Sequence, residues 1–117
     1  MNQVQRRFAI AKVARETAED AIAALRPDPP RRGATVEELE AYAQAVVGIQ
    51  ERVGYTDMVD AYIEARDELL AWGKGIAVAA AERYGADSAS IANLYERAGD
   101  FPNILEKVID ATMRVDA

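Results

Sequence analysis

The stretch Asp57–Tyr84 constrains the fold of this chain more than any other feature. It contains no proline, is bounded by Gly54 and Gly85, and repeats apolar side chains at the spacing of an α-helix. A single helix of this length extends about 42 Å, which exceeds the width of a small domain, so the other segments must pack along it. We therefore expect a central helix over residues 57–84.

Four further segments repeat apolar residues at helical spacing: about 2–25, 36–53, 88–98 and a last one that starts near Pro102. The connection between residues 53 and 57 is so short that helix 36–53 and the central helix should form an antiparallel hairpin. The predicted fold is all-α, a single-domain bundle of about five helices over residues 1–117, built around the helix 2–helix 3 hairpin.

The second helix has a start and an end that can be read from the sequence. Thr35-Val-Glu-Glu38 has the form of a capping box, in which Thr35 caps the helix and Glu38 reaches back to its amide. Gly54 can supply a left-handed turn at the other end. The apolar residues of this helix share one side, which we expect to face the core: Val36, Leu39, Ala43, Val46, Val47 and Val53.

Two residues of the central helix, Gly73 and Trp72, are unusual at their positions. Gly73 lies on the apolar face, where glycine costs up to about 1 kcal/mol relative to alanine. We expect a neighbouring backbone to approach closely there, with a kink at Gly73–Gly75 as the alternative. Trp72 points to one side of the apolar face, where it either closes the edge of the core or contacts another chain.

Composition excludes several kinds of chemistry. The 117 residues contain no cysteine and no histidine, which rules out disulfides, zinc sites of the Cys/His type and imidazole bases. The net charge of −6 comes from the second half, and this argues against direct nucleic-acid binding. No signal peptide or membrane span is evident, so we expect a cytoplasmic protein without membrane association.

The acidic residues form the strongest candidate for a chemical site. Four of them follow one side of the central helix, and two more lie one turn apart on the preceding helix: Asp57, Asp60, Glu64, Asp67, Glu37 and Glu40. At such helical spacings neighbouring carboxylates can share a divalent cation.

The two pairs Glu37-x-x-Glu40 and Glu64-x-x-Asp67 resemble the acidic signature of the MazG-like all-α nucleoside triphosphate pyrophosphohydrolases. The resemblance implies that these four carboxylates hold magnesium against the phosphates of the substrate. It covers four residues over about thirty positions. At about 100° per residue, both pairs point away from the shared core of the hairpin, as they would on a solvated face.

The N-terminal stretch Met1–Arg15 is basic, with Arg6, Arg7, Lys12 and Arg15 and no acid. It is a plausible contact for an acidic neighbour, including the second half of another copy of the chain. Arg15 falls on the apolar face of its helix. Its long aliphatic stem can lie over small neighbours and place the guanidinium in water or on a carboxylate. The alternative interpretation is that Arg15 binds an anion.

These patterns favour a non-enzymatic helical interaction or assembly protein, an adaptor or structural component that binds a protein partner, forms a homo-oligomer or belongs to a larger complex. No catalytic residue, metal or cofactor is assigned, and magnesium is expected only if the chain is a pyrophosphohydrolase. A second alternative is an acidic decoy or inhibitor of a nucleic-acid-binding protein. The residues expected to make contacts are Arg6, Arg7, Arg15, Asp57, Asp60 and Trp72.

Overall fold

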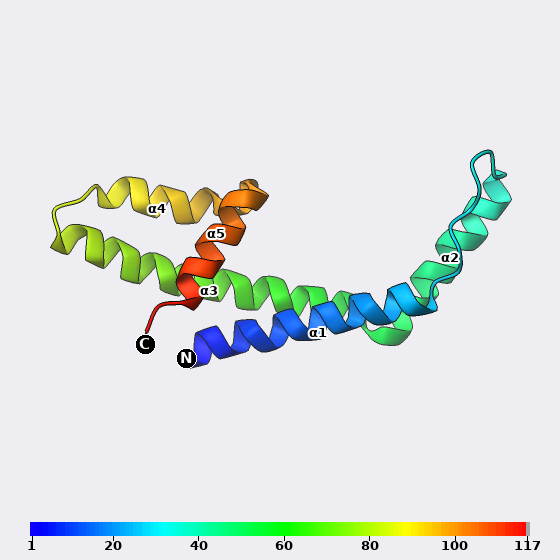
Figure 1. Ribbon diagram of the computed structural model, residues 1–117, viewed down its shortest axis with the longest axis horizontal. Helices are drawn as coiled ribbons and strands as arrows, with labels where there is room; N and C mark the ends of the chain where they lie inside the picture. The colour runs from blue at the N-terminus through cyan, green and yellow to red at the C-terminus, as the bar shows by residue number, and fades with distance from the viewer. Residues whose placement is uncertain (117) are drawn as a thin grey trace. The chain divides into compact units, whose positions relative to one another are not determined.

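The computed structural model describes residues 1–116 and is built of helices joined by short connections and one longer linker (Figure 1). The helices are α1 Gln3–Leu25, α2 Val36–Val53, α3 Tyr55–Arg83, α4 Ser88–Arg97, the 3-10 helix η1 Ala98–Asp100, and α5 Pro102–Met113. Within residues 1–116 there is no strand, so the prediction of an all-α fold with about five helices is confirmed. In that range no helix has the length and apolar character that a membrane crossing requires.

The chain divides into two compact units. The terminal unit contains Met1–Ala9 and the chain from Ile63 onward, and the middle unit contains Ile10–Tyr62. Helices α1 and α3 contribute to both units. The single domain over residues 1–117 remains a prediction.

The core of the terminal unit is built around α3, with contributions from α1, η1 and α5. Helix α4 runs back along the C-terminal part of α3, and α5 crosses α3 (Figure 1). The buried residues of this unit come from α1, α3, η1 and α5: Gln5, Phe8, Ala65, Leu69, Gly73, Ala81, Ala98, Val108, Ile109 and Thr112.

Helix α5 contacts α3 at Gly73. A Cβ atom on Gly73 would lie 2.6 Å from Cγ2 and 2.8 Å from Oγ1 of Thr112. The Thr112 side chain is buried, and its hydroxyl donates a hydrogen bond to the carbonyl of Val108 at 2.7 Å, so it has little freedom to move. The close approach predicted at Gly73 is present, but the neighbour is the side chain of Thr112 and not a backbone.

We expect Gly73→Ala to destabilise the protein by about 1–3 kcal/mol, because the added methyl group overlaps a fixed side chain and overpacking outweighs the gain in helix propensity. Gly75→Ala is the matched control, since no atom lies within 4 Å of a Cβ at that position. This second change should stabilise the helix by up to about 1 kcal/mol. Urea denaturation of both variants measures the difference, and effects of the same sign would contradict the packing at Gly73.

Gln5 joins the start of α1 to the end of α5. Its side-chain amide donates to the carbonyl oxygens of Thr112 at 3.1 Å and Val115 at 2.8 Å, while its own oxygen accepts from the amide of Asn2 at 2.9 Å. The Gln5 residue is 1% exposed. The carbonyl of Thr112 also accepts from the backbone amide of Val115 at 3.3 Å, so Gln5 adds a second donor there and supplies a donor to the carbonyl of Val115 just beyond α5.

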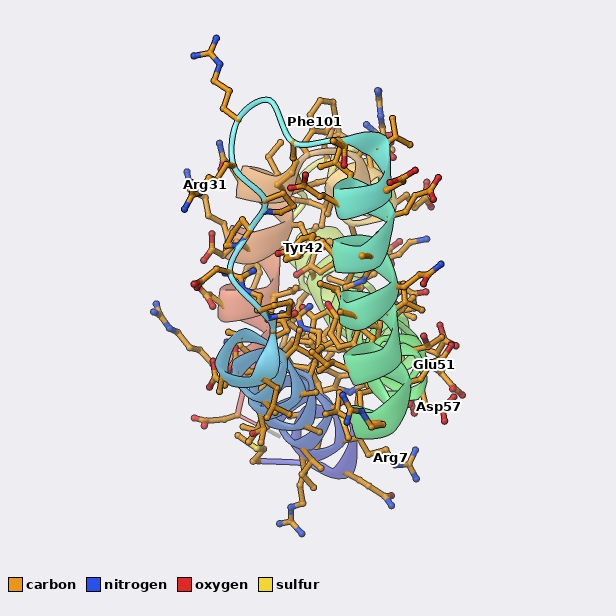
Figure 2. All side chains as sticks on the ribbon, turned by 90° about the vertical axis from the view of Figure 1, so that its right-hand side faces the viewer. Arg7, Arg31, Tyr42, Glu51, Asp57 and Phe101 are labelled. Atoms are coloured by element: carbon orange, nitrogen blue, oxygen red, sulfur yellow. The ribbon has the colours of Figure 1, made fainter. Side chains whose placement is uncertain are left out.

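The middle unit is organised around α2 and the linker that precedes it. The linker runs back beside α2 (Figure 1), and Tyr42 lies between the two (Figure 2). Thr35 caps α2 by accepting a hydrogen bond from the amide of Glu38, and Gly54 ends the helix with a left-handed φ of 68°. Both ends of α2 are therefore as predicted.

Few side chains of the middle unit are buried. Among residues 10–62, all of which the structure describes, the buried apolar residues are Ala18 and Ile49. Val36, Leu39 and Val47 are 69%, 50% and 49% exposed. The prediction that the apolar side of α2 faces the core is wrong for these three residues.

Candidate functional site

The acidic row of α3 lies on the surface. Asp57 and Asp60 are exposed in the middle unit, and Glu64 and Asp67 are exposed in the terminal unit. The carboxylate of Asp67 accepts a hydrogen bond from the guanidinium of the adjacent Arg66 at 3.1 Å. An exposed ion pair of this kind contributes about 0–1 kcal/mol, so it has little influence on the fold.

The acidic pair of the preceding helix belongs to a different unit from Glu64 and Asp67. Glu37 and Glu40 are both exposed on α2 in the middle unit. Within residues 1–116, no group of three or more acidic side chains is placed to hold a metal ion. The structure thus supplies no further support for the magnesium site that the sequence resemblance implies.

The basic residues near the N-terminus have different surroundings. Arg6 and Lys12 are exposed, whereas Arg7 pairs with Glu68 of α3 at 3.2 Å within the terminal unit. Trp72, the remaining predicted contact residue of that unit, is half-buried on α3.

Arg15 belongs to the middle unit and is held by two groups. Its guanidinium carbon lies 3.8 Å from the centre of the Tyr62 ring, which is the geometry of a cation–π contact. Its Nε atom lies 3.5 Å from a carboxylate oxygen of Glu19, as an ion pair without hydrogen-bond geometry. The guanidinium of Arg15 therefore lies beside a carboxylate. This agrees with the interpretation in which Arg15 pairs with a carboxylate.

Tyr55 completes this cluster. Its hydroxyl donates a hydrogen bond to Glu19 at 3.2 Å. Desolvation raises the pKa of Tyr55, the bond and charge of Glu19 raise it further, and the positive charge of Arg15 acts in the opposite direction. Together with the Arg15–Tyr62 contact, these interactions join α1 to the first turns of α3 inside the middle unit.

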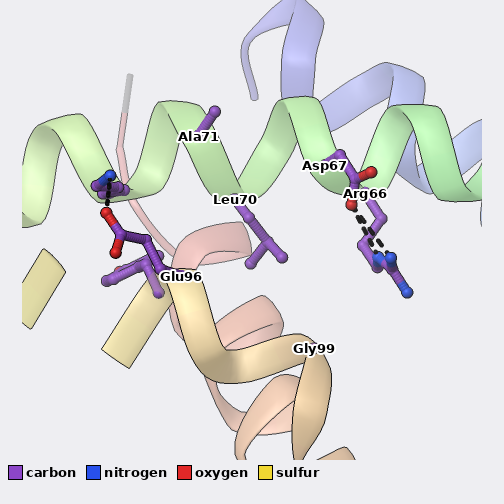
Figure 3. Close-up of a pocket in the computed structure, with 8 residues that line it drawn as sticks. Arg66, Asp67, Leu70, Ala71, Glu96 and Gly99 are labelled. Atoms are coloured by element: carbon purple, nitrogen blue, oxygen red, sulfur yellow. Dashed lines mark hydrogen bonds and ion pairs between the residues drawn. The ribbon is translucent and has the colours of Figure 1, made fainter. Parts of the chain in front are cut away.

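A groove of about 380 Å³ in the terminal unit lies between α3 and the α4–η1 segment (Figure 3). Leu70 points from α3 into this space. Lys74 of α3 pairs with Glu96 of α4 at 2.6 Å, and Arg66 pairs with Asp67. Since each of these four charges already has a partner, a charged ligand would have to displace an existing ion pair. The only pattern in the sequence that relates to this groove is the four-residue spacing of Arg66, Leu70 and Lys74 on α3.

Helix α2 of the middle unit carries an exposed apolar surface. At about 100° per residue its members lie within about 80° of one another around the helix. The linker lies along another side of α2, where Ala41, Tyr42 and Ala45 line a space that they share with Pro27 and Pro30. We call this surface the α2 stripe, and it consists of Val36, Leu39, Ala43 and Val47, all exposed.

An acidic edge flanks the α2 stripe. Glu37, Glu40 and Glu51 are exposed and fall on the same side of it at helical spacing. Glu51 lies in the last turn of α2, and the exposed Asp57 follows in the first turn of α3. The stripe therefore combines an apolar centre with negative charge along one border.

Comparisons of the chain with protein-family models, with curated proteins and with solved structures gave no match.

Proposed function

We propose that this chain is a non-enzymatic helical interaction or assembly protein that binds another protein through the α2 stripe. The observation that supports this proposal is the exposure of Val36, Leu39 and Val47, at 69%, 50% and 49%. Their spacing is that of a core-facing helix side, yet residues 1–116 leave about half or more of each of them exposed. Contiguous apolar surface of this kind is typical of protein–protein interaction sites.

The hydrophobic effect favours burial of the α2 stripe by a partner. Complete burial of a valine or leucine side chain contributes about 1.5–3 kcal/mol, and about half or more of the surface of each of these residues is still exposed. The middle unit buries only Ala18 and Ile49 among its apolar residues, so it has little core of its own. A partner that covers α2 would therefore stabilise the middle unit as well as bind it.

Two finer predictions belong to this proposal. The first is the antiparallel hairpin of residues 36–53 and 55–83 as the centre of a bundle, for which the short connection at Gly54 is the supporting observation. The second is a cytoplasmic location, supported by the absence of cysteine from the sequence. The pyrophosphohydrolase and decoy alternatives rest on the pattern of acidic residues alone.

Site-specific photo-cross-linking in cells of the source organism tests the proposal. A benzophenone amino acid placed at Val36, Leu39 or Val47 should give discrete adducts of higher mass, because these side chains would lie in the interface. Ala23 of α1 and Glu82 of α3 are exposed control positions outside the stripe and should give none. Equal labelling at stripe and control positions, or no adduct at any stripe position, would contradict the proposal.

A further inference from the structure

The charges that flank the α2 stripe are acidic. At about 100° per residue, Glu40 and Glu51 lie about 60° and 80° from the middle of the stripe. Both are exposed, and within residues 1–116 neither forms an ion pair. The one basic residue of α2, Arg52, lies about 180° from the middle of the stripe. The linker arginines Arg31 and Arg32 precede the helix, and Arg31 and Glu51 lie on opposite sides of α2 (Figure 2). A molecule that covers the stripe therefore meets exposed negative charge along one border.

The α2 stripe has the dimensions of a site for one helix. From Val36 to Val47 it extends for about three turns, or about 16 Å along the axis of α2. Its members follow one another at intervals of three and four residues, which is the spacing along which a second helix packs. Ala43 in its middle has a small side chain, which leaves room for a large apolar side chain of the partner. The shape therefore favours an amphipathic helix of about three turns.

The acidic border decides the charge of that helix. Negative charge attracts a basic partner, and it disfavours an acidic protein, an anionic lipid surface and nucleic acid. Resting on the proposed function, we propose that the α2 stripe binds a basic amphipathic helix of another protein. The apolar side of that helix covers Val36, Leu39 and Val47, and its lysine or arginine residues lie beside Glu40 and Glu51.

The helices of a second copy of this chain do not have the chemistry of such an occupant. The basic residues of α1 are divided among different contacts, because Arg7 pairs with Glu68 at 3.2 Å and Arg15 lies over the ring of Tyr62. Helices α3, α4 and α5 each contain at least as many acidic as basic residues. Helix α2 itself is acidic, so two α2 stripes would bring like charges together.

Two synthetic peptides test the proposal by fluorescence anisotropy with the full-length chain. Both are helical and repeat leucine at intervals of three and four residues, and the flanking positions are lysine in one peptide and glutamate in the other. The contact is smaller than a standard stable interface, so we expect a dissociation constant of about 10–100 μM for the lysine peptide. The glutamate peptide should bind at least about tenfold more weakly. Because opposite charges contribute, binding of the lysine peptide should weaken several-fold between about 50 mM and 500 mM salt.

Two double variants separate the apolar from the charged part of the site. V36Q/L39Q removes two side chains that the peptide would cover and should weaken binding of the lysine peptide at least about tenfold. E40Q/E51Q keeps the shape of both side chains and removes their charge. It should weaken binding about three- to tenfold and reduce the salt dependence. All four positions are exposed, so both variants should retain the helical circular dichroism of the wild type.

D60N/E64Q is the matched control for attraction by the net charge of −6. It also removes two exposed acidic charges, but from α3 and outside the stripe, so it should bind the lysine peptide as the wild type does. Four results would overturn the inference. They are no binding of the lysine peptide at 1 mM, equal binding of the glutamate peptide, full binding by V36Q/L39Q, or equal losses in D60N/E64Q and E40Q/E51Q.

The cellular cross-links distinguish failure of this inference from failure of the proposed function. Mass spectrometry of the adducts formed at Leu39 identifies the segment of the partner that lies on the stripe, and this segment should be helical, basic and from another protein. Adducts with an acidic segment or with a second copy would overturn the inference and leave the proposed function standing. Absence of stripe adducts, or binding to anionic phosphatidylglycerol vesicles that V36Q/L39Q abolishes, would overturn both.

Discussion

Leu69→Ala is expected to lower the free energy of unfolding by about 2–5 kcal/mol. Leu69 is 0% exposed in the middle of α3, so the substitution removes buried methyl groups and leaves a cavity in the terminal unit. The surrounding helices relax into such a cavity only in part, and the lost packing adds to the lost transfer free energy. A change of this size is a large fraction of the total stability of a small domain.

The fluorescence of Trp72 measures this effect, because it is the one tryptophan of the chain and lies in the terminal unit. Urea unfolding followed by this signal should shift to lower denaturant in Leu69→Ala. Leu94→Ala is the control, since Leu94 is 41% exposed on α4 of the same unit and should cost less than about 1 kcal/mol. Equal costs for the two changes would show that Leu69 is not part of a packed core.

Helix ends were predictable because the signals that set them are local. Thr35 accepts from the amide of Glu38, Gly54 adopts a left-handed conformation, and Asp87 caps α4. Pro102 stands in the first turn of α5, where its missing amide hydrogen costs nothing. Each signal depends on the few residues around it, so the sequence suffices to place it.

The partner of an apolar face was not predictable in the same way. Periodicity identified the apolar side of α2, but Val36 and Leu39 are exposed in the structure. In α3, Ile76 and Tyr84 follow the helical spacing of the other apolar residues, yet they are 38% and 81% exposed. Helical spacing shows which residues share a side of a helix, whereas what covers that side depends on segments distant in sequence or on another chain.

Long-range polar contacts also could not be predicted from the sequence. The hydrogen bonds from Gln5 to the end of α5 join residues more than a hundred positions apart, and the Lys74–Glu96 pair joins two helices. Glutamine at position 5 looks like an ordinary surface residue of a helix. Its role follows from the packing of α5 on the terminal unit, for which no local pattern exists.

Gln5→Glu should therefore destabilise the protein by about 3–5 kcal/mol near neutral pH, although the two side chains have the same shape. The wild-type amide donates to the carbonyls of Thr112 and Val115 from a buried position. A carboxylate cannot donate, so the substitution places a buried negative charge against carbonyl oxygens and removes the side-chain donor from both of them.

The pH dependence tests this assignment of Gln5. A protonated carboxyl group can donate to a carbonyl, and burial also favours the neutral form, so the introduced group should have a folded-state pKa above its ordinary value. The folded state then binds more protons than the unfolded state between these two pKa values, and the penalty relative to wild type should shrink as the pH falls. Gln3→Glu is the matched control, because Gln3 is exposed in the first turn of α1, where an acid is neutral or slightly stabilising. A penalty that stays constant with pH, or one shared by Gln3→Glu, would mean that Gln5 does not bind the end of α5.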